Sequence, residues 1–165
     1  MVFSQSLGQS ATRTVLKISI SLLSLLAASC APRANVFDEY LSGVHETDID
    51  VRGVHAATLF EGALPQDLPD KAAVFYTDGT CSVCIASVIR LYTDFRESRS
   101  DYSLVVLLDG PSRELFDFYW KKNFSDEPLA ERVQILLSPK ILDTPRGFYV
   151  VDGNAVTSFS IWTEN

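Results

Sequence analysis

The chain of 165 residues has the length of one domain with room for a tail. Its hydrophobic content of 47% is typical of a globular protein and can fill a core. The net charge of −7, with no cluster of Lys and Arg in the body of the chain, argues against electrostatic binding of nucleic acid. We therefore expect no nucleic-acid partner.

The N-terminal residues have the pattern of a targeting signal. Arg13 and Lys17 precede the apolar run ISISLLSLLAAS, which is too short to span a bilayer comfortably. A basic region, an apolar region and small residues describe a secretory signal peptide. Cys30 follows LLAAS directly, and this passage resembles the bacterial lipoprotein signal, with residues 1–29 removed. An ordinary signal peptide with a chance cysteine is the alternative.

The lipoprotein resemblance implies a location for the protein. Lipidation of Cys30 would anchor it to a membrane, because each buried acyl methylene contributes about 0.8 kcal/mol of membrane affinity. We expect a lipid-anchored protein of the bacterial cell envelope that faces the periplasm, where disulfides can persist. Cys81 and Cys84 would then be the only remaining cysteine pair.

The rest of the chain divides into a tether and a domain. Residues 30–57 are mixed and polar, and we expect a tether and N-terminal segment with a short helix around Val36–Leu41. The domain is expected over residues 58–165. Its predicted elements are a strand at 72–77, a helix of about four turns from Cys81 to Phe95, a strand at 102–109, a helix starting at Pro111, a strand at 132–138 and a hairpin around Asp152-Gly153. This order predicts an α/β fold with a parallel core and an antiparallel hairpin at one side.

The passage TDGTCSVCIAS carries the most chemistry, and three interpretations of Cys81 and Cys84 are open. A structural zinc site needs about four ligands, and His45 and His55 lie in the polar N-terminal segment without a familiar ligand spacing, so no metal is expected. A disulfide between them would close so short a loop that it removes little unfolded-state entropy. Redox exchange fits better, because a cysteine at a helix N-terminus is stabilised as thiolate and one a turn later can resolve a mixed disulfide.

The passages KAAVFYTDGTCSVC, SLVVLLD and DTPRGFYVVDGN together resemble the thioredoxin superfamily, most closely its TlpA-like and AhpC/TSA (redoxin) branch. The resemblance covers roughly residues 58–160. It implies a thioredoxin-like fold, with a mixed central sheet flanked by helices and a strand–helix insertion ahead of the proline loop. The usual C-terminal helix is expected to be missing, because the chain stops at Asn165, and the N-terminal segment or a partner is expected to cover the sheet there. The resemblance also implies that Pro145 is a cis-proline facing the cysteines and that Thr144 lends its backbone to a substrate; a trans turn proline is the alternative.

These features predict a membrane-anchored extracytoplasmic thiol–disulfide oxidoreductase acting on protein thiols or disulfides without a cofactor. Cys81 would attack and Cys84 would resolve. Asp78, so close to Cys81, would raise the pKa of that cysteine. A non-catalytic scaffold or binding module is the alternative, favoured by Thr80, where the family has Trp, and by the missing final helix. Copper or haem handling through the dithiol is a third hypothesis, but no downstream histidine accompanies the pair.

Overall fold

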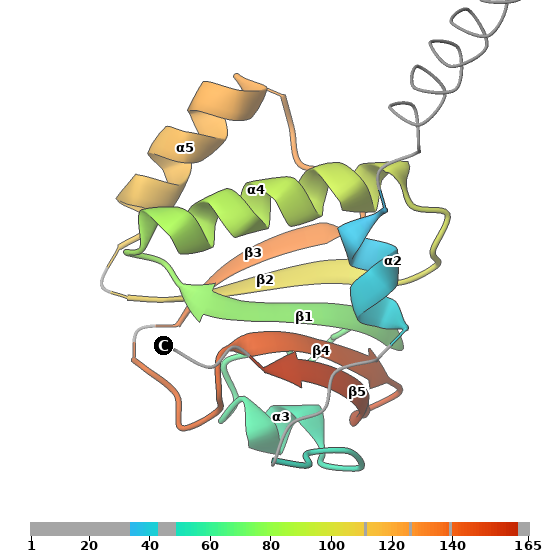
Figure 1. Ribbon diagram of the computed structural model, residues 1–165. Coiled ribbons are helices and arrows are strands. Elements are labelled where there is room, and N and C mark those ends of the chain that lie inside the picture. The colour runs from blue at the N-terminus through green and yellow to red at the C-terminus, as the bar shows by residue number, and fades with distance from the viewer. Residues whose placement is uncertain (1–33, 43–48, 111, 126, 139, 162–165) are drawn as a thin grey trace, which may run out of the picture. The chain divides into compact units, whose positions relative to one another are not determined.

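A computed structural model of the chain describes residues 34–42, 49–110, 112–125, 127–138 and 140–161. The predicted signal peptide and Cys30 lie outside these residues. In chain order the elements are α2 (Val36–Leu41), α3 (Ala56–Leu59), β1 (Lys71–Asp78), α4 (Ser82–Glu97), β2 (Ser103–Asp109), α5 (Glu114–Phe124), β3 (Val133–Ser138), β4 (Gly147–Asp152) and β5 (Ala155–Ile161) (Figure 1). None of the helices in the described part of the chain is long and apolar enough to cross a membrane.

The five strands form one mixed sheet in the order β3-β2-β1-β4-β5. β1 pairs in parallel with β2, and β2 pairs in parallel with β3. β4 is antiparallel to β1 and to β5, which lies at the sheet edge. The sequence prediction of an α/β fold with a parallel core and an antiparallel hairpin at one side is therefore confirmed.

The hairpin between β4 and β5 turns at the predicted place. Asp152 pairs with Ala155, so Gly153 and Asn154 form a two-residue connection. Gly153 has a φ of 60°, a conformation that favours glycine at the first position of such a turn. The turn sets the pairing next to it, and an irregularity between Val150 and Val151 shifts the register of the rest of the edge strand.

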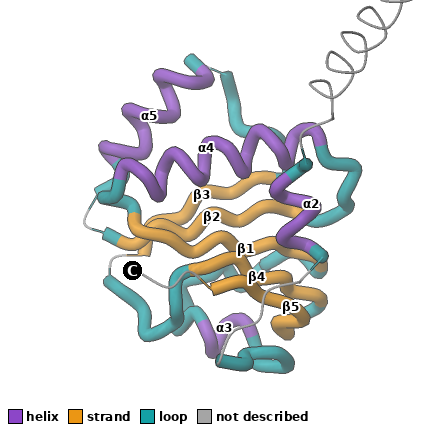
Figure 2. The backbone as a smooth tube through the Cα atoms, in the orientation of Figure 1, coloured by secondary structure: helices purple, strands orange, loops and turns teal. Residues whose placement is uncertain are grey.

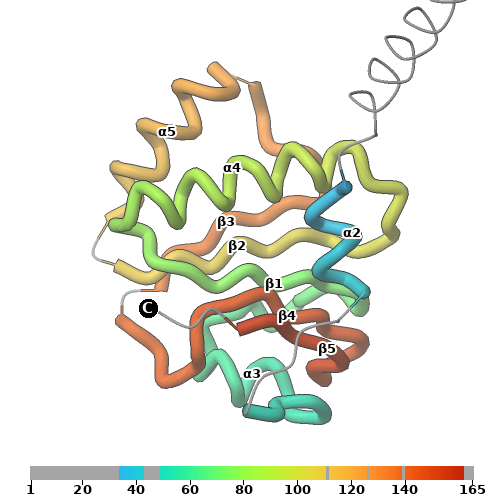
Figure 3. Tube along the Cα trace, in the orientation of Figure 1, coloured from blue at the N-terminus to red at the C-terminus, as the bar shows by residue number. Residues whose placement is uncertain are grey.

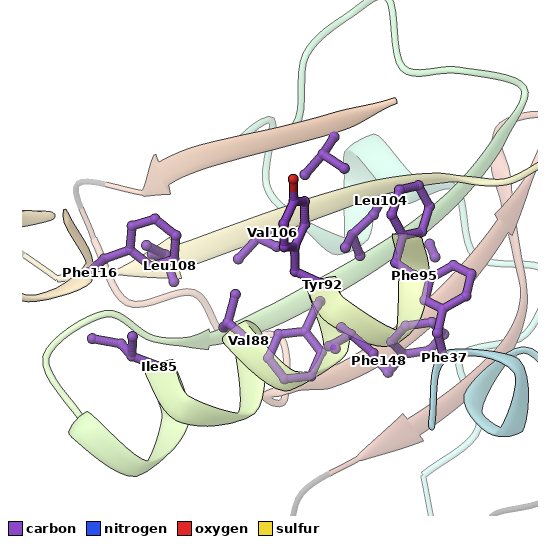
Figure 4. Close-up of a cluster of buried hydrophobic side chains, with 14 of the residues drawn as sticks. Phe37, Ile85, Val88, Tyr92, Phe95, Leu104, Val106, Leu108, Phe116 and Phe148 are labelled. Atoms are coloured by element: carbon purple, nitrogen blue, oxygen red, sulfur yellow. The ribbon is translucent and has the colours of Figure 1, made fainter. Parts of the chain in front are cut away.

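One face of the sheet is covered by the three helices α2, α4 and α5 (Figures 1 and 2). Alternate residues of β1 divide between the two faces, as the two-residue period of a strand requires. Ala73 and Phe75 point to the helical face and pack with Ile85, Val88 and Leu91 of α4. Figure 4 shows Ile85 and Val88 lying against the sheet, with Phe37, Phe95 and Phe148 gathered at one end of the cluster.

Residues 49–70, which include the short helix α3, cover the opposite face of the sheet. The core on this face consists of alternate residues of β1, β2, β4 and β5, side chains from this segment and Leu142 from the loop before β4: Val51, Ala56, Phe60, Leu64, Ala72, Val74, Tyr76, Val105, Leu107, Leu142, Tyr149, Val151, Val156 and Phe159. His55 caps α3, because its Nδ1 accepts the backbone N–H of Ala57 at 3.2 Å. Residues 49–57 therefore form part of the folded unit, which begins at Asn35.

The predicted helix at Val36–Leu41 is confirmed as α2, and it packs beside α4 although the two lie far apart in the sequence (Figure 3). Asn35 caps α2 and donates from its side chain to the Asp94 carbonyl at 2.7 Å, while the Val36 N–H donates to the buried Asp94 carboxylate at 2.9 Å. The Tyr40 ring stacks on Phe148 of β4 at 5.0 Å. The N-terminal segment thus covers β4 beside α4, and β5 is the last element of the described chain.

Helix α5 begins later than the sequence predicts. The prediction placed its start at Pro111, which lies outside the described residues, and the structure begins the helix at Glu114. The Glu114 N–H donates to the Ser112 hydroxyl at 3.4 Å, and Arg113 at the N-cap makes no side-chain cap bond. Serine side chains compete in this way with helical hydrogen bonding, which delays the start.

Candidate functional site: a cysteine pair at the end of the sheet

The cysteine pair lies at the end of the sheet where the parallel strands finish. β1 ends at Asp78, and its partner Asp109 ends β2 directly alongside. The chain leaves β1 through Gly79 and Thr80 and enters α4 at Ser82, with Cys81 as the N-cap residue. The predicted strand–turn–helix setting of the pair is confirmed (Figure 2).

The turn before Cys81 is held by Asp78. One carboxylate oxygen, Oδ1, accepts both the backbone N–H and the hydroxyl of Thr80, each at 2.7 Å. The backbone N–H of Cys81 donates to the same carboxylate. These bonds form the local turn that aspartate favours, so Asp78 positions the first cysteine.

Gly79 allows the two strand ends to approach closely. Its N–H donates to the Asp109 carbonyl at 2.8 Å. A Cβ on Gly79 would lie 2.7 Å from that carbonyl oxygen, closer than real Cβ atoms come, and 3.2 Å from the Cβ of Leu108, which is also a tight contact. Only glycine fits here, and the requirement comes from the packing of β1 against β2.

Cys81 has the environment of a nucleophilic thiol. Its sulfur accepts the Cys84 N–H at 3.3 Å, as an N-cap side chain does. Hydrogen bonds from the Cys84 thiol and from the Cys84 N–H lower the pKa of Cys81, and the Val83 N–H adds to the effect. The exposed N–H groups of the first helical turn thus stabilise the thiolate, as the sequence predicted.

Cys84 has the opposite character. Burial, the largest cause, and the hydrogen bond that it gives to Cys81 raise its pKa to about 11, although a hydrogen bond with Thr77 opposes the rise. Both cysteines are free thiols and partly buried. The two therefore differ in acidity, with Cys81 set to ionise first.

Asp78 acts on Cys81 in the direction that the sequence predicted. Its negative charge raises the pKa of Cys81. The hydrogen bonds from Cys84 outweigh this charge, so the net pKa of Cys81 is still lowered. Burial is the largest single influence on Asp78 and raises its pKa, but the hydrogen bonds from Thr80 and Cys81 and the positive charge of Arg146 together lower that pKa below its usual value.

Thr144 and Pro145 lie at the same end of the sheet as the cysteines. Antiparallel pairing of β4 with β1 ends at Gly147 opposite Tyr76, so the residues just before Gly147 run beside the end of β1. Thr144 is buried, and its hydroxyl donates to the Leu59 carbonyl. The role of these two residues in substrate binding stays a prediction.

The expected cis-proline is wrong. The described residues contain no cis peptide bond, so the Thr144–Pro145 bond is trans. The trans form is intrinsically favoured by about 0.5–1 kcal/mol. Two hydrogen bonds flank this trans peptide bond. The Thr144 hydroxyl donates to the Leu59 carbonyl, and the Tyr149 hydroxyl donates to the Pro145 carbonyl.

Sequence analysis missed three polar residues beneath the cysteine pair: Tyr76, Asp109 and Arg146. Asp109 is buried and accepts from the Arg146 guanidinium and from the Tyr76 hydroxyl. Its only sequence signal is a carboxylate at the end of the apolar run SLVVLLD, and the only signal of Arg146 is its place directly after Pro145.

Comparison of the chain with protein-family models, curated proteins and solved structures gives no match. The site is therefore interpreted from its own residues. No group of three or more His, Cys, Asp or Glu that could hold a metal ion is found in the described part of the chain. His45, one of the two histidines weighed as metal ligands, lies outside it.

Proposed function

We propose that the protein is a thiol–disulfide oxidoreductase that uses Cys81 and Cys84. The proposal rests on one observation: the Cys81 sulfur sits at the N-cap of α4, accepts the Cys84 N–H at 3.3 Å and has a lowered pKa, while Cys84 has a raised one. A low-pKa thiol attacks disulfides, and a second thiol within hydrogen-bond reach resolves the product. No cofactor enters this reaction.

The reaction in the reducing direction has two steps. The Cys81 thiolate attacks one sulfur of a substrate disulfide, the substrate S–S bond breaks, and a mixed disulfide forms with release of a substrate thiolate. Cys84 then loses its proton, and its sulfur attacks the Cys81 sulfur, so the mixed disulfide breaks and the second substrate sulfur leaves as a thiolate. The proton from Cys84 and one proton from solvent protonate the two substrate thiolates. The substrate gains two electrons and two protons, and the protein holds a Cys81–Cys84 disulfide; the oxidising direction is the reverse.

The raised pKa of Cys84 suits this order of events. In the reduced protein the negative charge on Cys81 and the hydrogen bond given to it both hold the proton on Cys84. Once the Cys81 sulfur is bonded to a substrate, it carries no charge, so this cause of the raised pKa disappears. Burial, the largest cause, remains, so the pKa of the resolving thiol falls part of the way when the mixed disulfide forms.

We also propose a thioredoxin-like fold for the unit that begins at Asn35. The supporting features are the cysteine pair between β1 and α4, the parallel β1–β2 pair and the antiparallel β4–β5 hairpin placed on the other side of β1. The resemblance to the TlpA-like and redoxin branch implies an inserted strand and helix ahead of the proline loop, and α5 and β3 lie between α4 and Pro145. Protein thiols and disulfides are the proposed substrates.

We propose further that Cys30 carries the lipid that anchors the protein at a periplasm-facing membrane surface. The support is the LLAAS-Cys30 passage alone. A Cys30→Ser variant should move from the membrane to the soluble fraction of the producing bacterium, and the wild-type N-terminal peptide should carry the mass of a lipid. A wild-type protein recovered entirely in the soluble fraction would exclude the anchor.

The oxidoreductase proposal is tested with the Cys30→Ser protein, in which the pair supplies all the thiols. Equilibration in buffers of defined dithiol-to-disulfide ratio, followed by alkylation, gives its redox potential, and turbidity of insulin reports reduction of a protein disulfide. We expect reversible oxidation and insulin reduction, and loss of both when Cys81→Ser is added. No turnover, together with a disulfide that strong dithiols fail to reduce, would exclude the proposal and favour a scaffold role.

A further inference from the structure

A positively charged residue links the two carboxylates at the ends of β1 and β2. Asp78 and Asp109 are partners in the parallel register. The guanidinium of Arg146, from the loop before β4, donates to Oδ2 of Asp109 from Nη2 at 2.9 Å and from Nε at 3.1 Å. Its Nη1 lies 3.7 Å from Oδ2 of Asp78.

The buried end of this link is fixed. The side chain of Asp109 is 2% exposed, and a carboxylate so buried has to be paired and hydrogen-bonded. The Tyr76 hydroxyl also donates to Asp109 at 3.0 Å and accepts the Leu142 N–H at 3.0 Å, so the carboxylate is held from a second side. Asp109 therefore fixes the place of the guanidinium below the cysteine turn.

The exposed end of the link reaches the residue that shapes that turn. The two carboxylate oxygens of Asp78 have different partners: Oδ1 accepts hydrogen bonds from Thr80, and Oδ2 faces the guanidinium of Arg146. Every carboxylate near a thiolate disfavours the thiolate, and a positive charge at the same place offsets that effect. Asp78 thus fixes the geometry of the cysteine turn, and the positive charge of Arg146 lies beside its carboxylate.

We propose that Arg146 is a positioning residue of the cysteine pair, which holds the Asp78 carboxylate in the turn and offsets its negative charge at Cys81. The inference rests on the proposed redox function of that pair. Besides Cys81 itself, five charged or titratable groups enter the argument, namely Cys84 from α4, Asp78 and Tyr76 from β1, Asp109 from β2 and Arg146 from the loop before β4. The directions of the pKa shifts agree, since Asp78 raises the pKa of Cys81 and Arg146 lowers that of Asp78.

The test measures how the rate of Cys81 alkylation depends on pH in the reduced Cys30→Ser protein, with the modified cysteine identified by mass spectrometry. Arg146→Gln keeps a hydrogen-bond donor near Asp109 but removes the charge, and we expect Cys81 to react several-fold more slowly near neutral pH. Arg146→Lys restores the charge and should recover much of the rate. Asp78→Asn should shift the profile the opposite way, toward lower pH.

A role in stability alone would not move this profile. An Arg146→Gln variant that folds and alkylates as fast as the parent protein, or faster, would overturn the inference. If that variant does not fold, the double variant Asp109→Asn with Arg146→Gln leaves no buried charge unpaired, and its Cys81 is expected to alkylate more slowly than that of Asp109→Asn alone.

The two proposals fail separately. A parent protein that does not reduce insulin, but whose Cys81 responds to Arg146→Gln, would overturn the oxidoreductase proposal and leave the electrostatic role of Arg146 supported. A parent protein that reduces insulin, with a Cys81 profile indifferent to Arg146→Gln, would overturn this inference alone.

Discussion

The ring of Phe37 in α2 lies 5.0 Å from the ring of Phe95 in α4, edge to face. Phe37 also meets Phe148 of β4 at 5.9 Å with the same geometry (Figure 4). The N-terminal segment, expected from sequence to be a tether with a short helix, thus contributes a fully buried side chain to the main core. It packs against α4 and β4 on one face of the sheet.

Truncation of this side chain should measure how much the N-terminal helix stabilises the unit. We expect Phe37→Ala to lower the free energy of unfolding by about 3–5 kcal/mol, because it removes a buried ring and leaves a cavity. Urea denaturation followed by far-UV circular dichroism measures the change. Phe118→Ala is the matched control, since Phe118 is 62% exposed, and it should change the stability little. Equal effects of the two substitutions would contradict the packing of α2 on α4.

The difference in acidity between the two cysteines predicts their alkylation. Only thiolate reacts, so the rate for each cysteine rises with pH and levels off above its pKa. Cys81, with its lowered pKa, should react first, and molecules in which Cys81 is still unmodified should carry no label on Cys84 until the pH approaches about 11. Mass spectrometry of the reduced protein after brief alkylation at a series of pH values checks this order. Preferential reaction at Cys84 would contradict the assignment of nucleophile and resolving thiol.

The hydrogen bonds from Cys84 are the main reason for the acidity of Cys81. Cys84→Ala removes the thiol donor but keeps the backbone N–H, so we expect the pKa of Cys81 to rise and its alkylation near neutral pH to slow several-fold. Cys84→Ser is the matched control, because its hydroxyl can still donate. The two variants should therefore differ in the pH profile of Cys81, and identical profiles would show that the side-chain bond has no effect.

Local patterns in the sequence were enough to predict most of the elements. The apolar run from Ala72 to Thr77, the apolar positions of α4 and the Asp152-Gly153 turn each signal their structure within a few residues, and each prediction is confirmed. The place of the cysteines between β1 and α4 followed from the same local signals. Such segments are specified by hydrophobic periodicity and by the residues of their turns, and both can be read from a single sequence.

The features that sequence analysis missed depend on contacts between distant segments. The link of Asp78, Arg146 and Asp109 requires the register of β1 with β2 and the course of the loop before β4, and neither has a signature in the chain. The docking of Phe37 on Phe95 has the same origin. The trans bond at Pro145 differs from the expectation because that expectation came from a family resemblance and not from the surrounding residues.

The buried charge at the end of β2 should be sensitive to loss of its partner. Asp109→Ala leaves the Arg146 guanidinium without its main partner and the Tyr76 hydroxyl without an acceptor, so we expect stability to fall by about 3 kcal/mol. Asp101→Ala is the matched control: Asp101 pairs with Lys71 at the protein surface, and its loss should leave the unfolding curve unchanged. Similar unfolding midpoints for the two variants would contradict the buried pairing of Asp109.

A methyl group added at Gly79 should disturb the cysteine turn specifically. In Gly79→Ala the new Cβ would meet the Asp109 carbonyl oxygen at 2.7 Å, so the ends of β1 and β2 have to separate. We expect a loss of about 1–3 kcal/mol in stability. We also expect slower alkylation of Cys81, because the turn that aims its sulfur at the Cys84 N–H shifts with the strand end.

Gly53→Ala is the matched control: its φ of 78° strains an alanine by about 1–2 kcal/mol, but nothing lies within 4 Å of the added Cβ. It should therefore lower stability by a similar amount and leave the Cys81 profile as in the parent protein, and a profile equally unchanged in Gly79→Ala would mean that the close contact of β1 with β2 does not position the nucleophile.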